Sequence, residues 1–340
     1  MIRQSQTETG RAVVLMRIKS RCSAISLLLL AGILPSQLRA QQPSLAGEPL
    51  IEISSPIPAS VVHRVEIDAA IRARDWEPAE RLLADEIDRQ PRSRDLLALL
   101  ARIFLLDGKP LNAAVALKKA EAIRPLDDEL RFTLALAYIR LGRGDWARPE
   151  LERLVESDPA KAVYRYWVGR LDYDASKYVA AIARFNEALA RDRQFLRAHD
   201  NLGLCYQALD EPDKAVEHFR EAVRLNRHAS AKSPWPPTNL AILLRQRGAP
   251  EEAGSLFREA LQYDANFAVA HYQLGLLLEE QGESDEAVAA LARAAAIDPT
   301  YAEPHYVLTR IYRRQGRALR ADEALATFLR LREARDQGPR

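Results

Sequence analysis

The sequence predicts an all-α solenoid of about eight helix-turn-helix repeats. Three observations carry this prediction: two apolar stretches with helical spacing recur every 34 residues, one register position is always alanine, and glycine or proline stands between the stretches. The composition agrees, because 48% of the 340 residues are hydrophobic and 28% are charged, as in soluble folded proteins. Length alone suggests two domains, but one period running over residues 60–335 indicates a single array.

Residues 1–40 have the layout of a secretory signal peptide. Basic residues between 17 and 21 precede an apolar run over 24–34, and the small Ala40 marks the expected cleavage point. This run is shorter than the roughly 20 residues that a membrane span needs; an uncleaved anchor is the alternative. Residues 1–15 are polar, and Met16 is an alternative start of the protein. We therefore expect an exported protein, periplasmic or secreted, without an integral membrane span after signal cleavage.

A proline-rich linker is expected over residues 41–59, because proline opposes helix and favours extended chain. Residues 1–40 hold six basic groups and one acidic group, so cleavage changes the net charge from +2 to −3. Such a balance gives no support for nucleic-acid binding, which usually needs a basic stripe. The mature chain keeps one cysteine, Cys205, and cannot form an internal disulfide.

The first helix of each repeat is expected to end at position 15, which is glycine in five repeats and suits the left-handed turn that closes a helix. The second helix begins near position 18 and ends before position 32, where proline recurs. Small residues at positions 8 and 20 let the two helices approach closely. A four-residue insertion at 230–233 is the only register break. The repeats start at residues 60, 94, 128, 162, 196, 234, 268 and 302 and are followed by a tail, 336–340.

The repeat motif is clearest in repeats five and seven. It is carried by residues 198–203 with Tyr206, Ala215, Phe219 and Ala222, and by residues 270–275 with Ala287, Ala294 and Pro299. With these residues the repeat resembles the tetratricopeptide repeat family. The resemblance covers residues 60–335 and implies a superhelix that binds a protein or peptide ligand in a concave groove. The end repeats depart from the pattern, with Glu66-Ile67 in the first and Thr309 in the last.

In this family the first helices line the groove, mainly through positions 2, 5, 6, 9, 12 and 13. Aromatic residues and arginines, which are enriched at interface hot spots, occupy many of these positions here. The partner-binding residues implied by the resemblance are Tyr166, Trp167, Arg170, Asn201, Trp235, Asn239, Arg245, Tyr272, Gln273, Tyr306, Arg310 and Arg313.

Two features of this surface have two interpretations each. Asn201, Asn239 and Gln273 share position 6 of successive repeats and resemble the asparagine ladder of O-linked N-acetylglucosamine transferases, which pairs with a peptide backbone. Alternatively, asparagine is simply common at this position. Trp235, between prolines, is either a rigid aromatic platform or a hydrophobic staple onto the neighbouring repeat; burial of its indole distinguishes them.

The histidines and Cys205 do not form a catalytic or metal-binding motif. Four histidines share position 4 of different repeats, on helices roughly 10 Å apart, too far to share one zinc ion with ligands at about 2 Å. His218 and His228 have no cysteine or carboxylate cluster at ligand spacing, and Cys205 has no histidine placed beside it. We therefore expect no enzyme activity, cofactor, metal or small-molecule substrate. The position-4 histidines are His63, His199, His271 and His305.

The signal layout and the resemblance together predict a non-catalytic protein–protein interaction scaffold of the bacterial cell envelope. The alternatives are a module that assembles through its open ends or, as the resemblance to exported relatives implies, an accessory subunit of a secretion, pilus or polysaccharide-export complex.

Overall fold

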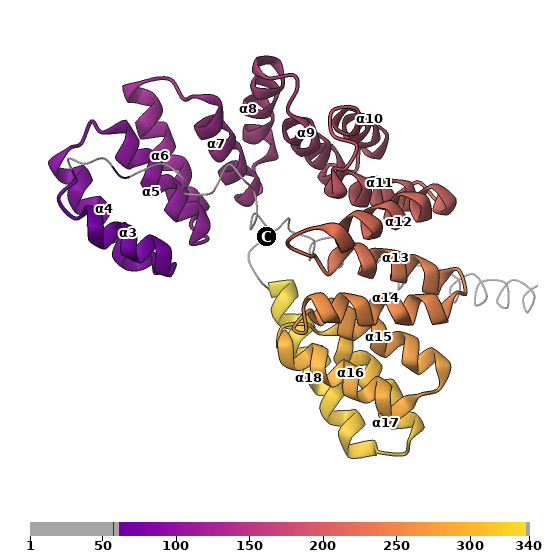
Figure 1. Cartoon of the computed structure of the whole chain (residues 1–340). Helices are drawn as coiled ribbons and strands as arrows, with labels where there is room; N and C mark the ends of the chain where they lie inside the picture. Colours follow the sequence, from indigo (N-terminus) through magenta and orange to yellow (C-terminus); the bar gives the residue numbers. More distant parts are fainter. Residues whose placement is uncertain (1–56, 58–60, 338–340) are drawn as a thin grey trace, which may run out of the picture. The chain divides into compact units, whose positions relative to one another are not determined.

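The computed structural model describes residue 57 and residues 61–337. The signal-peptide prediction and most of the linker prediction therefore concern residues outside this part. Within it the chain forms sixteen α-helices, α3 to α18, arranged as successive helix-turn-helix pairs (Figure 1), which confirms the predicted all-α repeat fold. None of the helices described is both long enough and apolar enough to cross a membrane.

Each pair consists of a first helix and a second helix. The first helices are α3 (Arg64–Ala73), α5 (Arg94–Leu106), α7 (Asp128–Arg140), α9 (Ala162–Asp174), α11 (Leu196–Ala208), α13 (Trp235–Gln246), α15 (Ala268–Gln281) and α17 (Glu303–Arg314). The second helices are α4 (Trp76–Arg89), α6 (Pro110–Ile123), α8 (Gly144–Ser157), α10 (Tyr178–Leu189), α12 (Pro212–His228), α14 (Pro250–Tyr263), α16 (Ser284–Ile297) and α18 (Ala318–Gln337).

Position 15 takes a left-handed backbone conformation in all eight repeats, not only in the five that have glycine. The φ angles of Arg74, Ser176 and Asp210 are 54°, 58° and 58°, in a region that costs a residue with a Cβ atom about 1–2 kcal/mol. The turn geometry is therefore imposed by the packing of the two helices, and glycine only lowers its cost. The five glycines are Gly108, Gly142, Gly248, Gly282 and Gly316.

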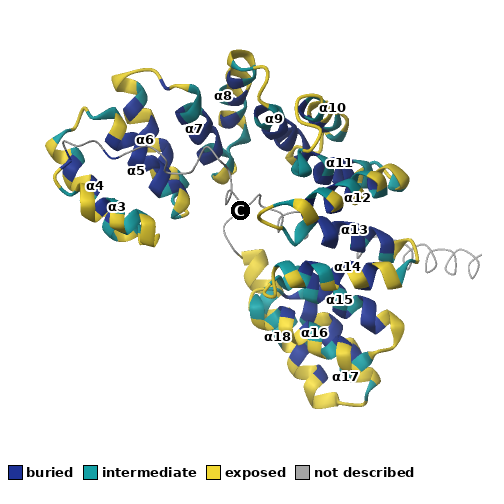
Figure 2. Ribbon diagram, in the orientation of Figure 1, coloured by how far each residue is buried: buried dark blue, intermediate teal, exposed yellow. Residues whose placement is uncertain are grey.

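The two helices of a pair meet at small residues. Gly203 lies so close to the Phe219 ring that an added Cβ atom would stand 2.4 Å from it. The alanine at position 20 is fully buried in every repeat, as Ala215 illustrates. This close approach buries apolar surface between the helices of each pair, while the outer faces of the second helices stay exposed (Figure 2).

Two features accommodate the insertion at 230–233: helix α12 is longer than the other second helices that precede a repeat, and a side chain holds the following loop. Helix α12 has 17 residues, and its buried Asn226 makes two hydrogen bonds to Ser233. The Asn226 Nδ2 donates to the Ser233 carbonyl at 2.8 Å, and the Ser233 N–H donates to Asn226 Oδ1 at 2.9 Å. The following helix α13 therefore starts in register despite the extra residues.

Neighbouring pairs stack because each second helix packs against the next first helix. Consecutive first helices also approach one another from α9 through α17, and α5 approaches α7, whereas α7 and α9 have no close backbone contact in the part described. At this junction Pro149 stands inside α8, where proline removes one helical hydrogen bond. An open pocket of about 370 Å³ lies at this junction, lined by residues that include Arg148, Leu171 and Lys177.

Candidate interaction surface

Positions 2, 5, 6, 9, 12 and 13 of the first helices define what we call the inner face. Its aromatic residues mostly contact other aromatic rings. Tyr166 is 2% exposed, and its ring centroid lies 5.0 Å from that of Phe195. Tyr272 is also buried and lies 5.1 Å from Tyr301. These rings therefore seal the joints between repeats, and little of their surface is available to a partner. Trp167 is fully buried.

Trp235 forms the same kind of joint. Its indole is partly buried and meets Phe267 edge-on, with ring centroids 4.7 Å apart and planes 78° apart. Phe267 is the last residue of repeat six and lies directly before α15, the first helix of repeat seven. The indole is thus partly buried at the entrance to repeat seven, and only part of it is accessible as a platform.

Asn201 is buried between repeats four and five. Its Oδ1 accepts a hydrogen bond from Arg170 Nη1 at 2.8 Å, and its Nδ2 donates to the Arg197 carbonyl at 2.8 Å. Arg170 is itself buried and donates through Nη2 to Asp174 at 2.8 Å. A peptide backbone that paired with Asn201 would have to displace these partners.

Asn239 bridges repeats five and six. Its Nδ2 donates to both carboxylate oxygens of Asp200, at 3.0 and 3.1 Å. Burial raises the pKa of Asp200 to about 6, although the bond from Asn239 and the charge of Arg170 lower it in part. The third carboxamide, Gln273, is 1% exposed. All three predicted ladder residues therefore lie beneath the accessible surface, with Asn201 and Asn239 holding neighbouring repeats together.

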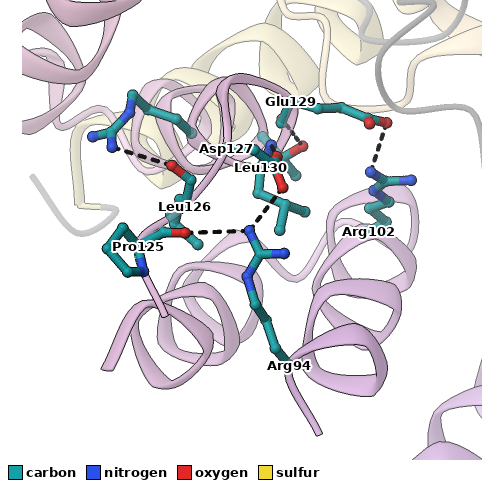
Figure 3. Close-up of polar contacts among 9 residues, drawn as sticks. Arg94, Arg102, Pro125, Leu126, Asp127, Glu129 and Leu130 are labelled. Carbon is teal, nitrogen blue, oxygen red and sulfur yellow. Dashed lines mark hydrogen bonds and ion pairs between the residues drawn. The ribbon is translucent and has the colours of Figure 1, made fainter. Parts of the chain in front are cut away.

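Similar polar bridges join other first helices. Between α5 and α7, Arg102 Nη2 donates to Glu129 Oε1 at 2.6 Å, and Arg94 Nη2 donates to Asp127 Oδ2 at 2.7 Å (Figure 3). Asp127 also caps α7 by accepting from the Leu130 N–H at 3.0 Å. Burial alone would raise the pKa of Asp127, but the bonds from Arg94 and Leu130 outweigh it and lower the pKa.

Further ion pairs join the first helices towards the C-terminal end. Arg245 on α13 pairs with Glu280 on α15. Glu279, on the same helix, pairs with Arg310 and with Arg314 on α17, the latter at 3.2 Å. The position-12 and position-13 residues of one repeat thus anchor its neighbours. Sequence reasoning missed these bridges because an ion pair between repeats shows no pattern within a single 34-residue unit.

Three of the predicted binding residues remain open to solvent, and all belong to α17. The Tyr306 residue is 50% exposed, the Arg310 side chain is 53% exposed, and Arg313 is exposed with no ion pair in the region described. Tyr306 occupies the same repeat position as Tyr166 and Tyr272 but contacts Phe328 of α18 at 5.3 Å. The accessible part of the predicted surface is therefore concentrated in repeat eight.

The remaining reactive groups among the described residues are Cys205 and the histidines. Cys205 is buried, and burial raises the pKa of its thiol to about 12, so it is protonated at neutral pH. No three metal-ligating side chains come together among the described residues. A histidine contact that the sequence did not predict joins the two helices of repeat five, where the Nδ1 atoms of His199 and His218 lie 3.2 Å apart.

The sequence and fold define the class of protein. Family models described as tetratricopeptide repeats match residues 65–128, 104–169, 196–229 and 244–311, more than half of the chain. Each second helix contacts the next pair as a repeat solenoid requires. The chain belongs to the tetratricopeptide repeat family, whose repeats are protein-interaction modules.

Known relatives share parts of this array. The chain is 33% identical over 121 residues to Superkiller complex protein 3 of Mus musculus, covering 32% of this chain and 8% of that protein. It is 29% identical over 139 residues to the type IV pilus assembly protein PilF of Pseudomonas aeruginosa, covering 40% of this chain and 55% of PilF. The chain thus spans only a small to moderate part of these relatives.

Solved structures show the same fold. The structure of PilF has a TM-score of 0.53 at 24% identity, covering 65% of this chain and 98% of that one. The hetero-tetramer Cut9–Hcn1 of the APC/C has a TM-score of 0.61 at 16% identity, covering 73% of this chain and 48% of that one. At these identities the similarity concerns the fold.

Proposed function

We propose that this protein is a non-catalytic scaffold that binds a peptide or protein partner on the inner face, chiefly at α17. The observation that carries the proposal is the exposure of Arg313 and Tyr306, because arginine and tyrosine are residue types that dominate binding energy at interfaces. A preformed solenoid surface also spares much of the ordering cost of association.

The partner we propose carries acidic side chains at its contact with α17. Arg310 and Arg314 already share Glu279, whereas Arg313 has no ion pair in the part of the chain described. A carboxylate beside Arg313 would gain a charge-assisted, potentially bidentate hydrogen bond. The buried carboxamides of the inner face lie on α11, α13 and α15 and would not contact the partner directly.

The cell-envelope setting is part of the same proposal. It is supported by the signal-peptide layout of residues 1–40 and by the sequence similarity to PilF, a type IV pilus assembly protein. If the partner belongs to a secretion, pilus or polysaccharide-export complex, this protein would be an accessory subunit of that complex.

Charge reversal at one exposed arginine tests the binding surface. Arg313→Glu is compared with Arg258→Glu, which changes an exposed arginine on α14, a second helix. We expect crosslinked partners from the native host to be lost with Arg313→Glu and kept with Arg258→Glu. Equal recovery of the same partners with both variants would remove α17 from the binding surface.

A second candidate function, assembly through the open end, is favoured by a different observation. Leu319 on α18 is 82% exposed and Leu329 on the same helix is 47% exposed, so the last pair presents apolar surface. Stacking of a second copy there would cover it. Light scattering at high concentration distinguishes the two candidates, because a persistent monomer argues against end-to-end assembly.

A further inference from the structure

Repeat five places two histidines against each other. His199 on α11 and His218 on α12 have their Nδ1 atoms 3.2 Å apart and their ring centroids 5.5 Å apart. Both side chains are partly exposed. His218 stacks on Tyr206, with ring planes only 9° apart. The pair therefore lies at the surface between the two helices of one repeat.

The other nitrogen of His199 fixes which of its atoms can bind a ligand. His199 Nε2 lies 3.2 Å from the Arg193 carbonyl, and an oxygen acceptor requires a proton on that nitrogen. When the ring is neutral, Nδ1 of His199 therefore carries no hydrogen, and its lone pair points toward His218. A carbonyl that accepts from the distal N–H is also the usual support of a metal-bound histidine.

The neutral ring of His218 can carry its hydrogen on either nitrogen. In the metal-free protein the hydrogen on Nδ1 of His218 can lie between the two rings and donate to His199. Moving this hydrogen to Nε2 of His218 leaves two lone pairs facing one small space, with no change in the charge of either ring.

We propose that His199 and His218 form a two-histidine site for a late first-row divalent metal ion such as Ni²⁺, Cu²⁺ or Zn²⁺. Imidazole nitrogens are favoured ligands of these ions. Two nitrogens 3.2 Å apart, each about 2.1 Å from one ion, subtend an angle of about 100°, between square and tetrahedral values. Because the nitrogens now face each other, both rings must turn by about 40° to converge on the ion.

Water would complete the coordination. Glu221, one turn beyond His218 on α12, is engaged by two hydrogen bonds from Arg224 at 2.7 and 2.6 Å. The site therefore has two protein ligands, in keeping with the absence of any three-ligand cluster in the described part of the chain. We expect it to bind more weakly than a structural zinc site with four protein ligands.

The chain supplies its own matched control. His271 occupies the same repeat position on α15, and its Nε2 lies 3.0 Å from the Ala265 carbonyl. The residue that corresponds to His218 in that repeat is Ala290. His271 thus has the supporting carbonyl without the second ligand.

The test is calorimetric titration of the untagged protein with NiCl₂. Wild type and His271→Gln should show the same binding event, whereas His199→Gln and His218→Gln should each weaken it roughly tenfold or more, because even loss of an outer-shell partner typically weakens metal sites 10–100-fold. Far-UV circular dichroism shows that each variant is folded. A Ni²⁺-dependent rise in melting temperature, present in wild type and His271→Gln only, supplies a second readout.

Two results would overturn the proposal. One is undiminished affinity in the double variant His199→Gln/His218→Gln, which would assign the binding to adventitious surface groups. The other is the absence of any saturable Ni²⁺ binding to wild type at millimolar metal.

Discussion

Asp200 offers a quantitative test of the buried polar bridges. Its carboxylate is 9% exposed and accepts both bonds from Asn239, and burial raises its pKa to about 6 from an ordinary value of 3.8. Because the folded protein binds this proton more tightly than the unfolded chain, the contribution of Asp200 to stability is complete below its unfolded pKa and is lost as the pH rises through about 6.

The size of the effect follows from the two pKa values. A difference of about two units corresponds to about 3 kcal/mol in total, of which roughly 1 kcal/mol falls between about pH 5 and pH 8. Asp200→Asn removes the titration, while its amide oxygen can still accept from Asn239. Relative to the variant, the wild type should therefore gain about 1 kcal/mol of unfolding free energy on going from pH 8 to pH 5.

Urea unfolding of both proteins, followed by circular dichroism at four pH values, measures this difference. Comparing the two proteins removes the opposite contribution of His218 and His305, whose lowered pKa values make stability fall with falling pH in both. A wild-type-minus-variant difference that is flat from pH 8 to pH 5, or that changes in the other direction, would refute the assigned environment of Asp200.

Three further substitutions test the repeat geometry by thermal or urea unfolding. Ser176→Gly should stabilise the protein by up to about 1 kcal/mol, because glycine relieves the left-handed φ of 58°; destabilisation would contradict this. Asn226→Ala should cost about 2 kcal/mol, since two buried hydrogen bonds to Ser233 are lost; a change below about 0.5 kcal/mol would mean that the clasp is not needed. Gly203→Ala should cost roughly 1–2 kcal/mol through overpacking against Phe219, and a neutral result would mean that the ring can shift freely.

Much of the fold could be predicted from the sequence because the 34-residue unit repeats the same local physics. Position 20 is alanine in every repeat, and position 15, which is glycine in five repeats, has a left-handed backbone in all eight. These two positions specify the same helical hairpin in each repeat. The left-handed turns at Arg74, Ser176 and Asp210 were not predicted from residue type, because arginine and serine do not favour that conformation and aspartate adopts it far less readily than glycine. Tertiary packing of the two helices imposes it.

The candidate surface was less predictable. Register position places Asn201, Asn239 and Tyr166 on the inner face, but their burial depends on side chains far along the chain, such as Arg170 for Asn201 and Phe195 for Tyr166. Likewise, the approach of His199 to His218 needs the facing geometry of two helices in one repeat. The sequence signal that could have indicated this contact is that repeat five has histidine at both position 4 and position 23.

The central claim is that a partner contacts α17 directly, and position-specific photocrosslinking in the native host tests it most directly. A photoreactive amino acid replaces Arg313 on α17 or Arg258 on α14, both exposed. We predict a discrete, light-dependent adduct at position 313 and none at position 258. An adduct at 258 alone, or none at 313 while the wild type still captures its partner, would contradict the claim.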